Sequence, residues 1–283
     1  MASTLAIVLA GAALVWGIFG VAFRKFRAAY EHDVDRELAR LQPPVATVTD
    51  DELAHLPAAV QRYLRAAGVV GNPRVHNFRV RMRGRIRGGP AARWIPFESE
   101  QYNVVDVPAR LFYITGSMMM IPVVGYHRYV GPSATMTIKA AALVPVVDAS
   151  GPEMNQGETV TLLNDMCVMA PATLIDRRLT WEAIDGHTAR VTFTNAGQTV
   201  SAELRFNDAD ELSDFRSDDR YQVSADGRSV RQVRWSTPIR EYRRFGNVRL
   251  ASAGEARWHE SAGDYAYIEL TIDRVEYNVR ART

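Results

Sequence analysis

Apolar and polar positions follow three different patterns along this chain, and the first is a continuous apolar run. Leu5–Phe23 contains no charged residue. A helix of that length, rising about 1.5 Å per residue, nearly spans a hydrocarbon layer of about 30 Å. Residues 1–27 are therefore predicted to form a membrane anchor, with a single spanning helix at residues 5–23, so that the membrane itself is a predicted partner.

The residues that follow the apolar run are predicted to be helical as well. Residues 28–48 mix acidic and basic side chains up to Pro43 and Pro44, which predicts a charged stalk and linker. Thr49 and Glu52 then have the spacing of a capping box, and apolar positions recur at helical intervals as far as Gly68. This second helix is expected to pack on the domain.

After Gly71 apolar positions alternate with polar ones, which is the pattern of a β-strand with one buried face. Between His76 and Arg87 most of the polar positions hold arginine. Strand-like runs follow at residues 94–105, 110–115, 134–139, 179–183, 189–194, 199–206, 221–223, 230–238, 254–259, 265–272 and 275–279. The runs are separated mostly by turn residues, so they predict an antiparallel sheet.

One helix interrupts the strands. Asn155–Ala170 lacks the alternation of a strand and ends before Pro171. Residues 49–283 are therefore predicted to form one α+β, mainly β domain. In this domain a large twisted antiparallel sheet of about ten strands wraps around the helix.

Composition and short motifs give little support to a catalytic or cofactor-dependent function. Lys and Arg number 34 against 32 Asp and Glu, so the net charge of +2 provides no global field for nucleic acid. Cys167 is the only cysteine, and the six histidines never pair at metal-ligand spacings, so no metal is expected. No Gly-rich nucleotide motif and no G-x-S-x-G sequence occurs, so no cofactor is expected and no catalytic motif is found.

The arginine-rich strand is the strongest local charge feature. Like charges on one strand face repel one another unless acids or anionic ligands lie opposite them. The structural explanation is a neighbouring strand that carries Glu98 and Glu100, and this explanation is favoured. The functional explanation is an anionic lipid headgroup held by Arg81, Arg83 and Arg85.

Two carboxylates on the predicted helix are the next candidates. Glu158 and Asp165 lie one heptad apart, so they share a helix face. Paired carboxylates carry out acid–base chemistry in many enzymes, and His127 or Tyr126 could join such a site. The structural alternative, a solvated helix face or ion pairs with the arginine-rich strand, is favoured. Cys167 is interpreted as a core residue.

Four stretches of the sequence carry a resemblance to a known family. They are RIRGGPAARWIPFESEQY, GYHRYVG, LLNDMCVMAPATLIDRRLTWEAID and GEARWHESAGDYAYIELTIDRVEYN. Through them the chain, from about Leu56 to Asn278, resembles the DUF6544/DUF6920 group of bacterial membrane-associated proteins of unknown function. The resemblance implies no active site, and Tyr126 stands where an acidic residue is expected. That family is similar in layout to the LolA-like and LppX-like half-barrels, which bind lipids or lipoproteins, so a half-barrel is implied here as well.

These features favour a binding protein over an enzyme. We expect a groove between sheet and helix that accepts a lipid or another hydrophobic or amphiphilic ligand. The residues expected around the ligand are Arg81, Arg83, Arg85, Glu158, Asp165, Trp94 and Trp181. Two alternatives stay open: an enzyme with a carboxylate site around Glu158 and Asp165, and a partner-binding module of an envelope complex with an exposed apolar patch.

The side of the membrane on which the domain lies is left open by the sequence. Arg24, Lys25 and Arg27 directly follow the apolar run, and the positive-inside rule then places the domain in the cytoplasm. The analogy to the half-barrels places it outside the cytoplasm.

Overall fold

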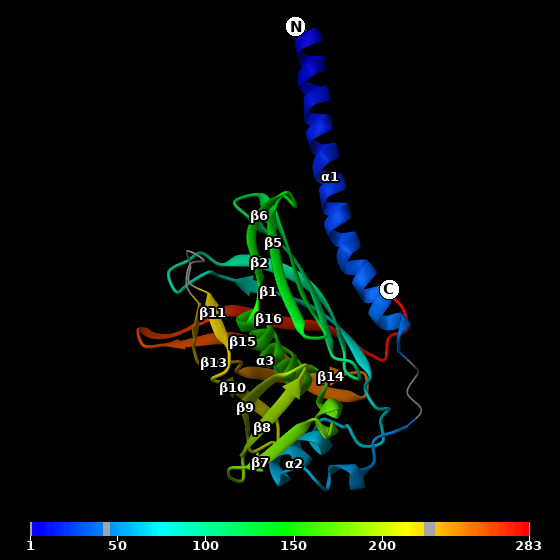
Figure 1. Cartoon of the computed structure of the whole chain (residues 1–283), viewed down its shortest axis with the longest axis vertical. Coiled ribbons are helices and arrows are strands. Elements are labelled where there is room, and N and C mark those ends of the chain that lie inside the picture. Colours follow the sequence, from blue (N-terminus) through cyan, green and yellow to red (C-terminus); the bar gives the residue numbers. More distant parts are fainter. Residues whose placement is uncertain (1, 42–45, 224–229, 283) are drawn as a thin grey trace.

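A long N-terminal helix leads into a mainly β domain (Figure 1). The structure is a computed structural model that describes residues 2–41, 46–223 and 230–282, with the backbone alone described for residues 2–16. The helices are α1 (Ala2–Ala39), α2 (Ala58–Ala66) and α3 (Pro152–Met169), with two short 3-10 helices, η1 (Asp50–Leu53) and η2 (Pro171–Ile175).

The prediction of a membrane-spanning helix is the main correction. Residues 5–16 of the predicted span Leu5–Phe23 lie outside the described side chains. Within the part of the chain that the structure describes, no helix has the length and apolar character that crossing a bilayer requires. The predicted single-pass membrane location is therefore wrong. The described turns of α1 carry charged residues from Arg24 onward and pack on the domain.

The second half of α1 lies on the outer face of the sheet. Tyr30 and Val34 are fully buried there against Tyr102 and Tyr113 of the sheet. The ring of Tyr30 stacks on that of Tyr113 at a centroid distance of 5.2 Å. Residues 28–39, expected as a charged stalk, thus form part of the packed structure.

One antiparallel sheet dominates the domain. Its strands and those of a small second sheet are β1 (Asn77–Ile86), β2 (Ile95–Val104), β3 (Ala109–Met118), β4 (Ile121–Val130), β5 (Ser133–Ala140), β6 (Val144–Ser150), β7 (Leu179–Ala183), β8 (Thr188–Asn195), β9 (Gln198–Phe206), β10 (Leu212–Ser217), β11 (Tyr221–Val223), β12 (Val230–Gln232), β13 (Trp235–Ser236), β14 (Ile239–Phe245), β15 (Val248–Glu260) and β16 (Gly263–Tyr277). In the described residues the main sheet has 14 strands, in the order β6-β5-β4-β3-β2-β1-β16-β15-β13-β10-β9-β8-β7, with β14 also paired to β15. It curls through 254° into a half-barrel.

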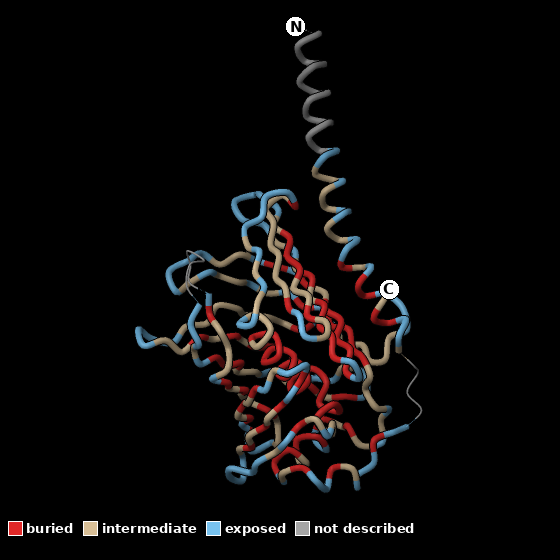
Figure 2. The backbone as a smooth tube through the Cα atoms, in the orientation of Figure 1, coloured by how far each residue is buried: buried red, intermediate tan, exposed pale blue. Residues whose placement is uncertain are grey.

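The helix α3 fills the concave side of this half-barrel. It contacts β5 and β6 on one side and β9, β10 and β15 on the other, so it lies between two arms of the sheet. We call β1–β6 the first arm, and β7–β10 with β13–β16 the second arm. Every residue from Gly157 to Met169 is buried, as Figure 2 shows for the centre of the molecule. A helix buried on all sides needs no single apolar face. This explains why apolar and polar positions are not clearly separated around α3.

Glycines on the concave face permit the sharp curl of the sheet. A Cβ atom on Gly84 would overlap the carbonyl oxygen of Glu269 on the paired strand. A Cβ atom on Gly125 would lie 2.7 Å from the side chain of Ile114. Strand glycines typically mark such close approaches of neighbouring chain segments.

The predicted mainly β class and the sheet around one helix are confirmed, while several boundaries differ. The predicted helix from Thr49 to Gly68 is divided into η1 and α2 by Pro57, which occupies the N-cap of α2. The runs 265–272 and 275–279 form the single strand β16. Strands β4, β6, β10 and β14 were not predicted.

Candidate functional site

The strand register shows which side chains of the first arm face the concave side. Ile114, Gly125, Ile138 and Val147 form one row across β3, β4, β5 and β6. The next row consists of Phe112, His127, Met136 and Ala149. Apart from the buried Gly125, all of these residues are half-buried. We call the apolar residues of the two rows the concave apolar surface. Each of the half-buried residues keeps part of its surface accessible to water.

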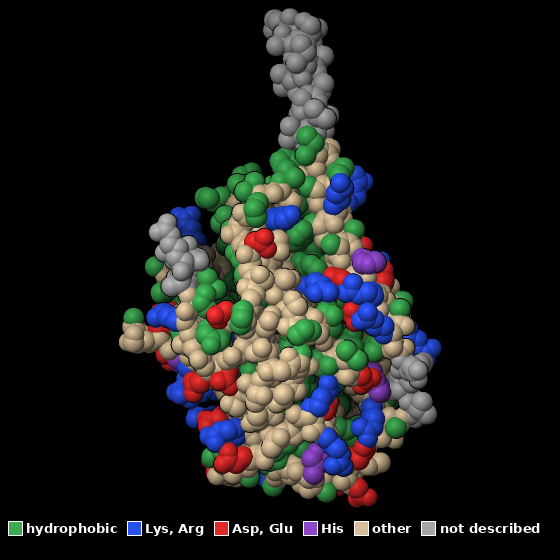
Figure 3. Space-filling view, in the orientation of Figure 1, with side chains coloured by type: hydrophobic (Ala, Val, Ile, Leu, Met, Phe, Trp, Pro, Cys, Tyr) green, Lys and Arg blue, Asp and Glu red, His purple; other side chains and the backbone are tan. Residues whose placement is uncertain are grey.

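The concave apolar surface continues to the tips of two hairpins. Met118 and Ile121 pair at the end of β3 and β4, and the turn between them holds Met119 and Met120, which are 80% and 95% exposed. The tip of the neighbouring hairpin exposes three more apolar residues, Leu143, Val144 and Val146. Figure 3 shows apolar side chains gathered at this end of the domain, beside α1. The concave apolar surface is therefore open to solvent at its upper end.

A buried polar cluster lies at the other end of this surface. Arg110 on β3 donates from Nε to Asp165 Oδ2 at 2.7 Å and from Nη1 to Glu158 Oε2 at 3.0 Å. Gln101 and Asn103 on β2 donate to the same oxygen of Asp165, at 2.6 and 3.1 Å. All five residues are at most 6% exposed. Such a network is stable because each charge has an opposite charge or a hydrogen-bond partner.

The opposite charges of Arg110 and Glu158 stabilise each other's ionised form. Burial disfavours the ionised form of Glu158, but the positive charge of Arg110 and the neighbouring His127 outweigh that effect and hold the pKa of Glu158 well below its usual range. Burial likewise disfavours the charged guanidinium of Arg110, yet Asp165 and Glu158 raise its pKa further. Glu158 and Arg110 therefore keep their charges at neutral pH.

His127 joins the buried cluster to the concave apolar surface. Its Nδ1 lies 3.7 Å from Glu158 Oε1, and its side chain is 20% exposed. Its ring meets that of Phe112 edge to face at 5.7 Å. The lower end of the concave apolar surface thus carries a polar group that a bound molecule can reach.

Aromatic residues of the second arm pack in the same hydrophobic core as α3. Trp258 stacks on Tyr267 at 5.5 Å, and Trp235 Nε1 donates to the hydroxyl of Tyr267 at 3.1 Å. Arg220, between β10 and β11, lies with its guanidinium 4.5 Å from the centre of the Trp235 ring. Nη1 of Arg220 donates to the carbonyl oxygen of Gly157 at 2.9 Å, so Arg220 reaches the same region of α3 as Arg110, which pairs with Glu158.

The arginines that were singled out from the sequence lie on the opposite face of the sheet. Arg81 pairs with Glu100, Arg83 with Asp273 and Arg85 with Glu269. The register places Glu98 opposite Arg83, but the ion pair of Arg83 is with β16. These three arginines therefore do not meet Glu158 and Asp165, which Arg110 brings together.

The two tryptophans expected near a ligand also lie apart from the concave apolar surface. Trp94 precedes β2, and the guanidinium groups of Arg85 and Arg87 lie 4.6 and 4.5 Å from its ring. Trp181 lies on β7 at the far edge of the second arm, and its buried Nε1 has no hydrogen-bond partner.

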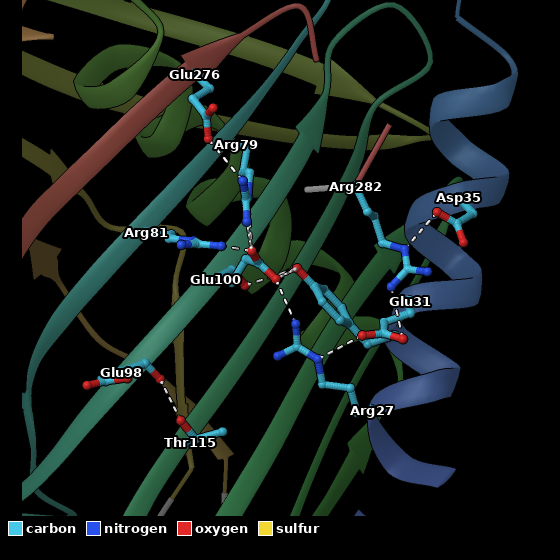
Figure 4. A network of polar contacts seen from close by, with 11 residues as sticks. Arg27, Glu31, Asp35, Arg79, Arg81, Glu98, Glu100, Thr115, Glu276 and Arg282 are labelled. Atoms are coloured by element: carbon cyan, nitrogen blue, oxygen red, sulfur yellow. Dashed lines mark hydrogen bonds and ion pairs between the residues drawn. The ribbon is translucent and has the colours of Figure 1, made fainter. Parts of the chain in front are cut away.

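The outer face carries a network of ion pairs that holds α1 to the sheet (Figure 4). Glu100 accepts from Arg79, whose side chain is 1% exposed, and from Arg27 of α1 at 3.1 Å. Arg79 also pairs with Glu276 at 3.0 Å. Because of these cations the pKa of Glu100 is lowered, although burial alone would raise it. Acids of the protein itself therefore neutralise these arginine charges.

Arg110, Gln101 and Asn103 were missed by the sequence analysis. Arg110 opens the predicted run 110–115, where it shares parity with Phe112 and Ile114. A cation on the apolar face of a strand is a signal for a buried partner. The glutamine and the asparagine gave no comparable signal because polar amides are common in strands that face solvent.

A chain of serine, histidine and aspartate lies elsewhere on the sheet. Ser236 Oγ is 2.7 Å from His259 Nε2, and His259 Nδ1 is 2.6 Å from Asp264 Oδ2. This order of contacts resembles a nucleophile with its base. Ser236, however, is only 1% exposed, so a substrate does not reach its hydroxyl in this structure. These hydrogen-bonded side chains are a structural connection between β13, β15 and β16.

A surface pocket of about 350 Å³ lies beside η1 and η2, and its wall includes His55, His76 and Asp106. His76 Nδ1 lies 2.6 Å from Asp106 Oδ2. Among the described residues, no group of histidines, cysteines or acids has the arrangement of a metal site. The pocket is therefore polar but carries no further sign of a ligand.

Comparisons with known proteins place the chain in a family and near several structures. The model of a family described as "Family of unknown function (DUF6544)" matches residues 46–270. A search of curated proteins finds no match.

Three solved structures are similar at low identity. A candidate outer membrane lipoprotein-sorting protein domain from Vibrio parahaemolyticus is 9% identical, with a TM-score of 0.42 over 73% of this chain and 87% of that one. A DUF1329 family protein from Desulfovibrio piger is 11% identical, with a TM-score of 0.44 over 81% and 95%. A LolA superfamily protein from Nitrosomonas europaea is 10% identical, with a TM-score of 0.36 over 79% and 95%. The expected likeness to LolA-like proteins is found, but at this level it leaves the function open.

Proposed function

We propose that this chain, which belongs to the DUF6544 family, binds a hydrophobic or amphiphilic small molecule on the concave apolar surface between the first arm and α3. The observation that carries the proposal is the set of half-buried apolar residues on the inner face of β3–β6. Inner-face positions of a sheet normally bury such residues against another layer. Of the apolar residues in these rows, Phe112 packs against the core around α3, whereas Ile114, Met136, Ile138 and Val147 belong to neither core cluster of the described residues.

A ligand would supply the missing layer. Removing apolar surface from water is favourable by roughly 25 cal/mol per Å². Ligand sites are typically concave, mostly apolar and furnished with a few polar groups that orient the ligand. The exposed tips around Met119 and Met120 give such a molecule an apolar path into the half-barrel.

The polar end of the surface favours an amphiphile over a pure hydrocarbon. His127 lies half-buried at the lower end of the concave apolar surface, beside Glu158. A molecule with an apolar tail and a polar head can therefore cover Ile114 and Ile138 with its tail and place its head toward His127 and α3.

A carboxylate enzyme at Glu158 and Asp165 has less support. Both carboxylates accept hydrogen bonds from Arg110, and the pKa of Glu158 is lowered. An acid–base catalyst that works near neutral pH needs a pKa close to that pH. The lowered pKa therefore opposes a role for Glu158 as a general acid.

The proposal can be tested by native mass spectrometry of the full chain, purified from the cells that express it. We expect the folded protein to carry an additional bound mass. Extraction with organic solvent should release this molecule for identification. Ile114→Asn places an unpaired amide on the concave apolar surface, which costs roughly 1–3 kcal/mol when the amide is buried, so binding should weaken about tenfold or more. Thr115→Asn changes the next residue, which is exposed on the outer face, and should bind normally. Equal binding by both variants would contradict the proposal.

A further inference from the structure

We propose that the ligand's head carries an anion, a carboxylate or a phosphate, and that Arg220 binds it. This inference rests on the proposed function, because it assigns the head of the molecule whose tail covers the concave apolar surface. It concerns a residue of the second arm that the sequence did not single out. The geometry of its guanidinium carries the inference.

One side of the Arg220 guanidinium is fixed by α3. Its Nη1 donates to the carbonyl oxygen of Gly157 at 2.9 Å and to the hydroxyl of Thr161. Its plane lies over the ring of Trp235 at 4.5 Å, and the ring of Trp258 lies at 5.9 Å. A guanidinium held by two acceptors and an aromatic face has few alternative positions, so it is preorganised for binding.

The other side of this guanidinium has no hydrogen-bond partner among the described residues. Nε of Arg220 is buried and has no hydrogen-bond partner. Nη2 makes no hydrogen bond to any of the described residues, unlike Nη1. Nε and Nη2 point in the same direction in a guanidinium group, and two oxygens of a carboxylate or phosphate match this pair of donors. This edge is therefore suited to bind an oxyanion through both donors.

The acids of the neighbouring cluster are already paired with another arginine. Glu158 is the acid through which Arg220 is electrostatically linked to the buried cluster, and it already accepts from Arg110. Asp165 is also paired with Arg110, so Arg110 is the ion-pair partner of both acids. Arg220 nevertheless makes no ion pair with a described acid. A neutral hydroxyl head can accept a hydrogen bond from one donor of this edge, whereas a carboxylate or phosphate accepts from both donors and carries the opposite charge.

Three probes with the same tail separate this inference from the proposed function. Dodecanoate, dodecyl phosphate and dodecanol are titrated into the delipidated full chain at pH 8, where the dodecanoate and dodecyl phosphate probes are ionised. Binding is followed by displacement of a fluorescent apolar dye. We expect at least one of the two anions to bind about tenfold or more tightly than dodecanol, since hydrogen bonds to charged groups are the stronger ones. The tighter anion identifies the head as a carboxylate or a phosphate.

The variant Arg220→Gln should lose this preference and still bind dodecanol as the unmodified chain does. Arg83→Gln is the matched control, because Arg83 lies on the outer face with 65% of its side chain exposed, and it should keep the preference. Equal binding of all three probes by the unmodified chain would overturn the role of Arg220 and leave the proposed function intact. Loss of dodecanol binding in Arg220→Gln would also overturn it, since the residue would then be structural. Failure of all three probes to bind the unmodified chain would count against the proposed function itself.

Discussion

Arg110 and Asp165 form the central contact between the sheet and the helix it surrounds, with Nε of the arginine 2.7 Å from Oδ2 of the aspartate. The same guanidinium reaches Glu158, two helical turns earlier on α3. One side chain of β3 therefore fixes both the position and the rotation of α3. The polar end of the concave apolar surface depends on this arrangement.

Replacing Arg110 should destabilise the protein strongly. In Arg110→Met the carboxylates of Glu158 and Asp165 stay buried without their cation, and breaking a buried ion pair in this way costs about 3–5 kcal/mol. The free energy of unfolding, measured with urea, should fall by that amount. Arg83→Met, on the exposed outer face, should change it by less than about 0.5 kcal/mol. Similar losses in both variants would show that the Arg110 cluster contributes no more to the free energy of unfolding than an exposed arginine does.

Glu158 should make stability depend on pH in the acidic range. Its pKa in the folded protein is lower than in the unfolded chain, where a glutamate titrates near pH 4.3 by ordinary values. The stability that it contributes is therefore complete above about pH 4.3 and is lost as the pH falls toward the folded pKa. Between pH 5 and pH 3 the unmodified chain should lose more unfolding free energy than Glu158→Gln. Parallel pH profiles would contradict this assignment.

The curl of the sheet should depend on Gly84. In Gly84→Ala the new methyl group meets the backbone of Glu269 and cannot move away without displacing β16. Such overpacking typically costs about 1–3 kcal/mol, which thermal unfolding can measure. Gly88→Ala is the control, because nothing lies within 4 Å of its Cβ position. An unchanged melting temperature for Gly84→Ala would show that the close approach of β16 does not require glycine at this position.

The attachment of α1 should depend on Glu100. Glu100→Gln removes the negative charge shared by Arg27 and the buried Arg79. Amide hydrogen exchange of α1 from about residue 26 onward should become faster, and the unfolding free energy should fall by about 2–4 kcal/mol. Glu98→Gln, two residues away on the same strand face, should leave the exchange unchanged, because no described cation pairs with Glu98. Equal exchange in the two variants would contradict the role of the network.

The sequence predicted those elements whose pattern is local. The alternation from His76 to Arg87 gave β1, with its arginines on one face and Phe78 and Val80 on the other. Glu100 was also a correct partner for this face, because cross-strand pairing follows the parity of neighbouring strands. The single-pass membrane location was predicted wrongly, because no helix of the described residues is long and apolar enough to cross a membrane; the charged turns of α1, expected to be a stalk, pack on the sheet.

The site itself depends on contacts between distant parts of the chain. Arg110 and Asp165 are separated by 55 positions, and only the register of β2 to β4 shows that Arg110 faces α3. Arg220 lies outside the regular strands, so no periodicity marked it. Pairing of sheet strands with a buried helix is decided by tertiary packing, which a one-dimensional pattern does not encode.

The central claim is that an apolar molecule binds to the inner face of the first arm, and photo-crosslinking tests it most directly. A dodecyl probe with a diazirine in its tail is bound to the full chain and irradiated, and the modified peptides are mapped by mass spectrometry with and without excess dodecanol. The account predicts competable labelling of Phe112, Ile114, Met136 or Ile138. Competable labelling confined to the outer-face residues of the same strands, such as Tyr113 and Thr115, or no competable labelling at all, would contradict it.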